Sequence, residues 1–551
     1  MVLVKRRMIM AENYTREQLD TMSRKELVQA FLKMQEGFSV MQKNYENTDR
    51  QMQLLLEQLA DNKRHRFGRS SERLEDDGQI SFFESDPAYA VFNEAEAVSD
   101  LPEEEPKKRG TKKKGKREED LKDLPIKEVP HEIPKEDLER FFDGEDYKQL
   151  PDEIQRRYVY KPAETYIEEH HIHVYAGKKT ERMIKAEHPK ALLNGSLVSP
   201  SLAAGIMNAK YVNAVPLYRQ ETMYRNDGLA VTRKNMADWM IKLADRYLSV
   251  LYERMHEELL HADVLQADET PVRVNKDGRD AGSKSYMWVY RSGRYDTAHP
   301  VILYDYQKTR KADHPREFLK DFSGVCVTDG YQVYHTIEKE REDLTIAGCW
   351  AHARRRYDEA LKALPKDKRK GCLANTALKM IRAVYKADEA SEGFPPEERQ
   401  KHRQAAVRPL VEAYFAWIKE NHGNVLKGTK TEKGMQYSIN QEKYLKTFLE
   451  HPDVPMDNNA AEQSIKNFCI GKKNWLSCDT VSGADASAII YSITETAKAN
   501  GLRPYYYLEY VLSVLPEHME DKEYSFIEDL LPWSENLPEE CRRLEKQTSK
   551  K

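Results

Sequence analysis

The sequence of 551 residues contains no apolar run long enough to cross a bilayer, and its start carries positive charge without an extended apolar segment. These absences predict no membrane-spanning segment and no secretory signal. No charge of one sign dominates either, because 88 Lys and Arg nearly balance 92 Asp and Glu, giving a net charge of −4. The chain therefore has no overall basic footprint, and any binding of nucleic acid has to use local patches.

Cysteine is scarce, with six residues scattered over the chain. Such sparse use predicts reduced thiols and a cytoplasmic location instead of a disulfide framework. None of the cysteines falls in residues 126–190, where His170, His171 and His173 cluster. Structural zinc sites usually combine cysteine and histidine ligands, so zinc is not expected at these histidines.

A long helix is predicted over residues 15–62, with Ser23 and Glu26 forming a capping-box pattern near its start. Between Leu27 and Leu59, mostly apolar residues recur in steps of four and three, which is the heptad pattern of a coiled coil. We therefore expect residues 1–62 to form a coiled-coil helix that assembles a homodimer or higher homo-oligomer. The alternative is a helix packed against its own chain.

Two basic clusters follow in residues 63–125, a region that is poor in core-forming residues and is expected to be a linker. The first cluster spans 63–73 and the second spans 107–117. Clustered cations bind DNA phosphates by releasing counterions, although solvated linkers also carry such charge. The candidate DNA-binding residues in these clusters are Arg66, Arg69, Arg73, Lys112, Lys113 and Lys114.

Two smaller regions precede the predicted strands. Residues 126–190 contain short alternating segments and are expected to form a small domain. Residues 191–255 are predicted to be helical, with a break at Gly228 and with Thr232 as the N-cap of the next helix. Two helices joined by a glycine-containing turn are typical of a DNA-binding helix-turn-helix, but they also occur in ordinary helical packing.

The next part of the chain predicts an α/β fold. The expected order is three strands, a helix, a strand, a helix and a strand, which is the order of an RNase H-like mixed sheet. In that arrangement the first and fourth strands are neighbours, so Asp268 and Asp329 are expected to face one another. The predicted strands lie in residues 264–274, 285–291, 301–306, 324–331 and 344–349. A long helical stretch is predicted from Tyr357 to Leu449.

Three acidic residues stand where they suit metal binding. Asp268 lies near the middle of the first strand and Asp329 ends the fourth. Glu462 falls in the first turns of a helix for which Asn458 or Asn459 is the expected cap. A buried carboxylate is costly unless a cation or hydrogen-bond donors receive it. Mg²⁺ takes one or two carboxylates together with substrate phosphates, and two such ions can cut a phosphodiester. The trio therefore predicts a divalent-cation site for phosphodiester chemistry.

Other residues nearby offer alternatives. An arginine such as Arg273 would neutralise Asp268 in a purely structural ion pair. Glu269, Asp453 and Asp457 are rival carboxylates, although alternation along a strand should turn Glu269 away from the face that carries Asp268.

Eight short motifs together resemble one known family. They occupy residues 66–72, 216–221, 267–271, 328–331, 349–355, 457–462, 471–476 and 504–508. On these motifs the chain resembles the IS-sixty-six family of bacterial insertion-sequence transposases, in the DDE superfamily. The resemblance covers nearly the whole chain.

The resemblance implies Asp268, Asp329 and Glu462 as the catalytic, metal-binding triad, with two ions of Mg²⁺ or Mn²⁺ as cofactor. It also implies an RNase H-like catalytic core in residues 256–357 and 451–500, a helical insertion in 358–450 and a C-terminal helical tail in 501–551. The implied partners are double-stranded DNA, both element ends and target, and two short companion proteins of the same element. Family members usually carry a zinc module with two cysteine pairs before the core, and the cysteines of that module are absent from residues 126–190.

Residues around the fifth strand and after Glu462 complete the candidate site. Cys349 and His352 form a Cys-x-x-His pair that is expected beside the active site. The alternatives are half of a zinc site and a packed cysteine with a helix-capping histidine. Nearby cations and one aromatic residue could bind phosphates and stack a base. These candidates are Arg354, Arg355, Lys472, Lys473 and Trp475.

The expectation from the sequence is therefore a DNA transposase that cleaves and joins strands with the help of divalent metal. Two alternatives stay open. One is a catalytically inactive DNA-binding remnant or regulator of the element, and the other is an RNase H-like nuclease without strand transfer.

Overall fold

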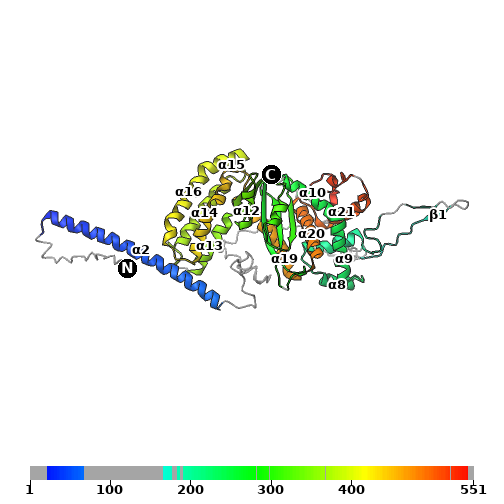
Figure 1. Ribbon diagram of the computed structural model, residues 1–551, viewed down its shortest axis with the longest axis horizontal. Helices are drawn as coiled ribbons and strands as arrows, with labels where there is room; N and C mark the ends of the chain where they lie inside the picture. The colour runs from blue at the N-terminus through cyan, green and yellow to red at the C-terminus, as the bar shows by residue number, and fades with distance from the viewer. Residues whose placement is uncertain are drawn as a thin grey trace, which may run out of the picture.

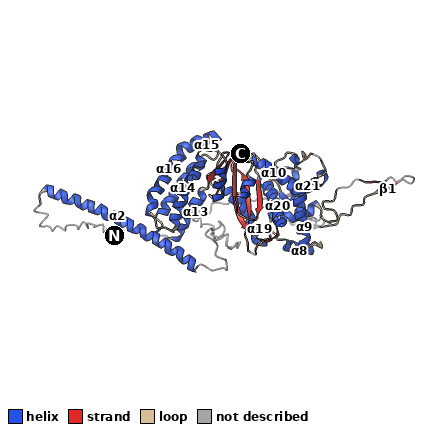
Figure 2. Cartoon of the chain, in the orientation of Figure 1, coloured by secondary structure: helices blue, strands red, loops and turns tan. Residues whose placement is uncertain are grey.

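The computed structural model describes residues 22–67, 165–176, 183–186, 190–280, 282–296, 298–365, 368–521 and 523–543. These residues form an α/β protein in which one five-stranded mixed sheet lies among many helices (Figure 2). Among the described residues, no helix combines the length and the apolar character that a bilayer span requires. The predicted α/β class is therefore confirmed.

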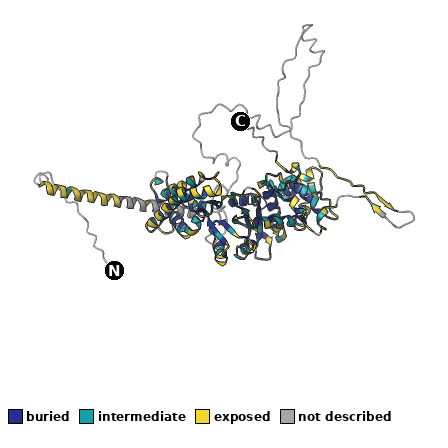
Figure 3. Ribbon diagram, turned by 90° about the horizontal axis from the view of Figure 1, so that it is seen from above, coloured by how far each residue is buried: buried dark blue, intermediate teal, exposed yellow. Residues whose placement is uncertain are grey.

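A single long helix, α2 (Arg24–Phe67), projects from the body of the molecule (Figure 1). The predicted capping box is present, because the Glu26 carboxylate accepts from the Ser23 amide at 2.8 Å and the Glu26 amide donates to the Ser23 hydroxyl at 3.4 Å. The helix ends five residues later than predicted, at Phe67 in place of position 62. Apolar side chains along the predicted seam are exposed in the single chain (Figure 3), namely Leu27, Phe31, Met34, Phe38, Met41 and Met52.

A second projection is the hairpin of β1 (Val174–Ala176) and β2 (Met183–Lys185), which pair antiparallel (Figure 1). These strands fall in the region where short alternating segments were predicted. The side chains of His170, His171 and His173 are exposed on this arm. No group of metal ligands forms around them in the described part of the chain.

Residues 191–255 are helical, as predicted. Gly228 has a φ of +87° in the turn between two of the helices, a conformation that glycine adopts without strain. Thr232 caps the next helix by accepting from the Asn235 amide at 3.2 Å, again as predicted. The main helices are α7 (Pro200–Met207), α8 (Leu217–Asn226), α9 (Arg233–Leu243) and α10 (Ser249–Leu260).

The central sheet has the order β6-β5-β3-β7-β8. β3 pairs antiparallel with β5 and parallel with β7, so the predicted first and fourth strands are neighbours, as expected. The strands are β3 (Val264–Val272), β5 (Ser285–Ser292), β6 (Ile302–Gln307), β7 (Gly324–Thr328) and β8 (Leu344–Gly348). Two short helices connect them, α11 (Asp313–Phe318) and α12 (Gln332–Glu340).

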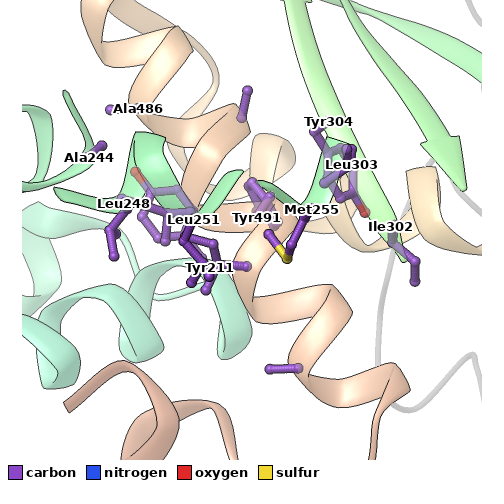
Figure 4. Packing of buried hydrophobic residues seen from close by; sticks show 14 of the residues in the cluster. Tyr211, Ala244, Leu248, Leu251, Met255, Ile302, Leu303, Tyr304, Ala486 and Tyr491 are labelled. Carbon is purple, nitrogen blue, oxygen red and sulfur yellow. The ribbon is translucent and has the colours of Figure 1, made fainter. Parts of the chain in front are cut away.

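The open edge at β6 is closed by a helix instead of another strand. The hydroxyls of Ser492 and Thr496 on α20 (Val481–Ala499) accept from the amides of Tyr304 at 2.7 Å and Ile302 at 3.0 Å. These bonds satisfy edge amides that would otherwise template a further strand. Figure 4 shows the apolar contact behind this edge, where Leu251 and Met255 of α10 lie beside Tyr491 of α20.

The predicted helical stretch after β8 forms a lobe on the other side of the sheet, with its own apolar core around Trp350, Tyr357 and Tyr414 (Figure 1). Its helices are α13 (Trp350–Ala363), α14 (Leu373–Glu389), α15 (Pro396–His402), α16 (Arg408–Asn421), α17 (Lys430–Asn440) and α18 (Glu442–Lys446). The chain then returns to the sheet through α19 (Asn459–Trp475), and after α20 it forms α21 (Pro504–His518) and α22 (Ile527–Leu530).

One small sheet was not predicted. β4 (Val274–Lys276) pairs parallel with β9 (Cys478–Thr480), which follows α19. This ladder ties the end of α19 to the continuation of β3. Both ends of α19 are therefore fixed relative to the strand that carries Asp268.

Candidate active site

Strand register brings Asp268 and Asp329 together. Gln266 of β3 lies opposite Val327 of β7, so continuing the parallel register by two residues places Asp329 level with Asp268. The Asp268 carboxylate accepts from the Glu269 amide at 2.8 Å, and the Asp329 carboxylate accepts from the Tyr331 amide at 2.9 Å. Both acids thus lie just past the point where the pairing of these two strands ends, with Asp268 inside β3 and Asp329 directly after β7.

Glu462 reaches the same region from the first turn of α19, and its side chain is buried. Its carboxylate faces α13, with Oε1 at 3.6 Å from His352 Nδ1 and Oε2 at 3.4 Å from the Arg355 guanidinium. Oε1 is buried and makes no hydrogen bond to the described residues. Glu462 thus has part of its ligand capacity unused, and within the described residues the group of ligand atoms that lie within 4.8 Å of one another joins it to Cys349 and His352 and includes neither strand acid.

The start of α19 is fixed by polar contacts that sequence reasoning missed. Asn458 occupies the N-cap position, but its side chain does not cap the helix. It donates to the Ala267 carbonyl at 2.8 Å and accepts from the Gln266 side chain at 3.3 Å. The prediction that the Asn458 side chain caps α19 is thus wrong, because this buried amide forms its hydrogen bonds with residues of β3 instead. Asp457 accepts from the Asn459 amide at 3.2 Å in its place.

The pKa values of two of these buried acids are raised. Burial raises the pKa of Asp268 well above its usual value, and the charges of Glu269, Asp329 and Glu462 raise it further. Burial also raises the pKa of Glu462 to about 7, opposed by Arg355 and reinforced by Asp457 and Asp329. Burial is therefore the main reason that both pKa values are raised, and the neighbouring acids add to it.

The rival carboxylates have protein partners of their own. Arg310 donates to Glu269 through Nε at 2.7 Å and also through its terminal nitrogen. Arg399 pairs with Asp453 at 2.9 Å. Asp457 accepts from the Tyr385 hydroxyl at 3.2 Å as well as from Asn459. Each of these acids therefore receives donors, although Oε2 of Glu269 is buried without a hydrogen-bond partner among the described residues, as Oε1 of Glu462 is.

The expected alternative for Asp268 was an ion pair with Arg273. Arg273 is exposed, and the arginine that meets a carboxylate in this part of the site is Arg310, through Glu269. The guanidinium of Arg310 also stacks on the Tyr331 ring at 3.7 Å, and the Tyr331 hydroxyl donates to the Arg310 carbonyl at 2.8 Å. This network links β3 to the loop that carries Asp329.

Cys349 and His352 lie beside Glu462, and the three residues offer ligand atoms that all lie within 4.8 Å of one another. The Cys349 sulfur accepts from the Asn458 amide at 3.2 Å. Burial raises the pKa of the Cys349 thiol well above its usual value, whereas burial lowers the pKa of His352 to about 4. Burial therefore favours the neutral forms of both the thiol and the imidazole.

The candidate cations after Glu462 and on α13 differ in their surroundings. Lys472 donates to the Pro271 carbonyl at 2.6 Å, Lys473 is exposed, and Arg354 is exposed on α13. Arg66 lies in the last turn of α2, and only its place in the helix is described. The other candidates, Arg69, Arg73, Lys112, Lys113 and Lys114, lie outside the described residues.

Trp475 is partly buried against the protein. Its ring meets Tyr211 edge-on at a centroid distance of 6.3 Å and lies 6.3 Å from the ring of Tyr491. A Cβ atom on Gly471 would come within 2.1 Å of the Trp475 ring, so this glycine is required for the ring to fold back over its own helix. The next residue, Leu476, is the one that points into solvent.

Comparison with protein families agrees with these features. Residues 195–486 match the model described as Transposase IS66 family, and residues 492–533 match the IS66 C-terminal element. Residues 54–129 match a model described as Transposase C of IS166 homeodomain. These matches define the class of the protein as an insertion-sequence transposase. Because the first match covers more than half of the chain, the protein belongs to the IS66 (IS-sixty-six) transposase family.

Three proteins of Sinorhizobium fredii (strain NBRC 101917 / NGR234) are similar to this chain. Uncharacterized protein y4qI is 29% identical over 370 residues, covering 65% of this chain and 67% of its own length. Uncharacterized protein y4jD is 26% identical over 369 residues, covering 65% and 71%. Uncharacterized protein y4hP is 25% identical over 404 residues, covering 71% and 70%.

Proposed function

We propose that this transposase cleaves DNA at the ends of its element and joins the freed 3′-hydroxyl to target DNA, with Asp268, Asp329 and Glu462 as the metal-binding catalytic triad. The observation that supports the proposal is the strand register, which brings Asp329 level with Asp268, together with Glu462 in the first turn of α19. Burial raises the pKa of Asp268, and the charges of Glu269, Asp329 and Glu462 add to that rise. Such a cluster is costly in the absence of a cation and becomes favourable when one binds.

The arrangement of the sheet supports an RNase H-like core in residues 256–357 and 451–500. Numbering the five main strands in chain order, their spatial order is third, second, first, fourth, fifth. The first three are antiparallel neighbours and the last two run parallel to the first. This order puts an acid of the first strand beside the end of the fourth.

The residues fit hard divalent cations such as Mg²⁺ or Mn²⁺, and we propose two ions. The donors of the triad are carboxylate oxygens, which such cations prefer, and Glu462 Oε1 is buried without a hydrogen-bond partner among the described residues. When bound, such ions lower the pKa of water and stabilise the leaving oxygen of a phosphodiester. Arg355 holds Glu462 from α13, while Arg354 and Lys473 are exposed and suited to contact phosphates.

The remaining parts of the chain are assigned by the same proposal. Residues 1–62 form a coiled coil that joins copies of the transposase, 63–125 are a linker, 126–190 are the cysteine-free counterpart of the zinc module, and 191–255 carry a helix-turn-helix. Residues 358–450 are the helical insertion and 501–551 are the C-terminal tail. The exposed seam on α2 supports self-association, because apolar heptad positions are buried only against a partner. We place this DNA-acting protein in the cytoplasm, with the element's two short companion proteins as further partners.

The test is Asp268→Asn in purified full-length protein, with labelled duplexes that cover the DNA flanking the reading frame. The substitution keeps the shape of the side chain and removes its charge. We expect nicking and joining in Mg²⁺ to be lost while DNA binding persists. Asp321→Asn, in an exposed turn outside the site, is the matched control and should keep wild-type activity.

Each other outcome has a distinct meaning. Joining by the Asp268→Asn variant would refute the triad. Wild-type cleavage without joining would favour a nuclease that lacks strand transfer. Wild-type binding without cleavage would favour a DNA-binding remnant or regulator.

A further inference from the structure

Leu476, directly after α19, combines exposure with backbone strain. Its φ and ψ are +66° and −45°, and the Ser477 amide donates to the Trp475 carbonyl at 2.8 Å across it. This is the γ-turn with positive φ, which is rare and strained, and a bulky residue with positive φ is an outlier. The side chain is 73% exposed. A glycine would satisfy the same turn without strain, so the leucine is retained at a cost to stability.

The turn is held in place on both sides. Asn474 donates to the Ala214 carbonyl at 2.8 Å, and the Asn275 side chain donates to the Ser477 hydroxyl at 3.3 Å. The β4–β9 ladder begins two residues after Leu476. Strained residues persist only where their surroundings fix them in this way, and they are concentrated at functional sites. Leu476 is therefore presented on a rigid support.

The position of Leu476 relative to Glu462 is set by one helix. Glu462 lies in the first turn of α19 and Leu476 directly follows its last residue, so the two mark opposite ends of this helix. The rise of the helix separates them by about 21 Å, which corresponds to roughly six base pairs of B-DNA. A duplex that runs along α19 with a phosphate at the acidic cluster would therefore pass Leu476.

The charges around Leu476 suit a polyanion. Lys473, three positions before Leu476, is exposed. Arg273 is exposed too, and its carbonyl accepts from the amide of Cys478, two positions after Leu476, at 2.9 Å. Asp479, an acid of the same segment, is paired with Lys276 at 2.6 Å. An exposed apolar side chain in a segment with basic residues has the composition of the wedges that proteins insert between base steps.

From these observations we infer that Leu476 is an apolar wedge that unstacks a base step of the bound duplex, about six base pairs from the acidic cluster by the helical geometry. The inference rests on the proposed function, because it takes duplex DNA as the substrate. Phosphate contacts supply most of the affinity, and Leu476 supplies local distortion. Its neighbour Trp475 supports the turn from inside.

The experiment uses full-length protein without Mg²⁺, so that no cleavage is needed. Duplexes tiled over the DNA that flanks the reading frame each carry one 2-aminopurine, whose fluorescence rises when it is unstacked. Binding is followed by fluorescence anisotropy on the same duplexes. The variants are Leu476→Gly, which removes the side chain and the strain together, and Leu476→Met, which keeps an apolar wedge. Leu197→Ala removes an exposed leucine from a different part of the surface, where Leu197 is 96% exposed, and serves as control.

We expect wild type, Leu476→Met and Leu197→Ala to raise the fluorescence severalfold at one position of a bound duplex. Leu476→Gly should abolish the rise while weakening binding by about tenfold at most, since counterion release dominates affinity. Its melting temperature should match or exceed that of wild type, because strain is relieved.

Three outcomes would overturn the inference. The first is an equal rise with Leu476→Gly. The second is a bound wild-type complex with no rise at any position, which would leave the proposed function intact. The third is a loss of self-association in Leu476→Gly, which would assign the leucine to a contact between copies. If wild-type protein binds none of the duplexes, the proposed function falls as well.

Discussion

Arg403 is fully buried in the helical lobe, and its replacement is the perturbation that the structure predicts in most detail. Its Nε donates to Asp388 at 2.7 Å. Its Nη1 lies within hydrogen-bonding distance of four carbonyls of one segment, those of Phe448, His451, Pro452 and Val454, at 2.9 to 3.1 Å. That segment leads from the lobe into α19, so Arg403 fixes the approach to Glu462.

Arg403→Met keeps much of the side-chain volume and removes the charge and every donor. Asp388 then stays largely buried without its cation, and the carbonyls lose their shared donor. Removing one partner of a buried ion pair costs about 3–5 kcal/mol. For a unit of about 150–250 residues, each kcal/mol lowers the melting temperature by about 2–4 °C, so the expected decrease is about 6–20 °C.

Urea and thermal unfolding of the full chain would measure this cost. Arg403→Met combined with Asp388→Leu should recover much of the lost stability, because no uncompensated charge is left buried. Arg408→Met is the matched control, because Arg408 pairs with the exposed Glu450 and should change stability by about 1 kcal/mol at most. If Arg403→Met lowers the free energy of unfolding no more than this control does, the hydrogen bonds of Arg403 are not a source of stability and the reasoning is refuted.

Two further predictions concern other parts of the molecule. Burial raises the pKa of Asp305 from 3.8 to about 7, so the folded state binds the proton of this acid more tightly than the unfolded state does. The stability gained from this protonation is fully present below about pH 4 and is lost as the pH rises through 7. Asp305→Asn should therefore match wild type at pH 4 and exceed it by up to about 4 kcal/mol at pH 8 in urea titrations, and equal curves at pH 8 would contradict the burial argument. Phe38→Glu with Met41→Glu, on the exposed seam of α2, should convert the protein to a smaller species in light scattering without lowering its melting temperature. An unchanged mass would remove the seam as the site of self-association.

Local patterns were sufficient to predict the elements that carry the candidate site. Apolar residues on both sides of Asp268 marked its strand, and the acid that follows β7 fell beside it because the first and fourth strands are neighbours. Ser23 with Glu26 and the cap at Thr232 were also predictable, since capping chemistry involves residues only three apart. In each case the responsible interactions are short in sequence or follow from the order of the elements.

Contacts between distant residues were not predictable. Asn458 was expected to cap α19, yet its amide bonds to β3, nearly 200 positions away, because a buried Gln266 and a strand carbonyl compete for it. The β4–β9 ladder is three residues long in each strand and carries no periodic signal. The positive φ of Leu476 was also hidden, because a leucine gives no warning of a conformation that glycine usually adopts.

The two strand acids and the helix acid depend on different parts of the molecule. Asp268 and Asp329 are positioned by adjacent strands, whose register alone brings them together. Glu462 follows the helical lobe, and α19 meets β3 through Asn458 at its start and the β4–β9 ladder at its end. Two residues of the lobe help to position Glu462. Arg403 donates to carbonyls of the segment before α19, and Arg355 of α13 contacts the Glu462 carboxylate. A change that loosens the lobe should therefore displace Glu462 while leaving the pair of strand acids in register.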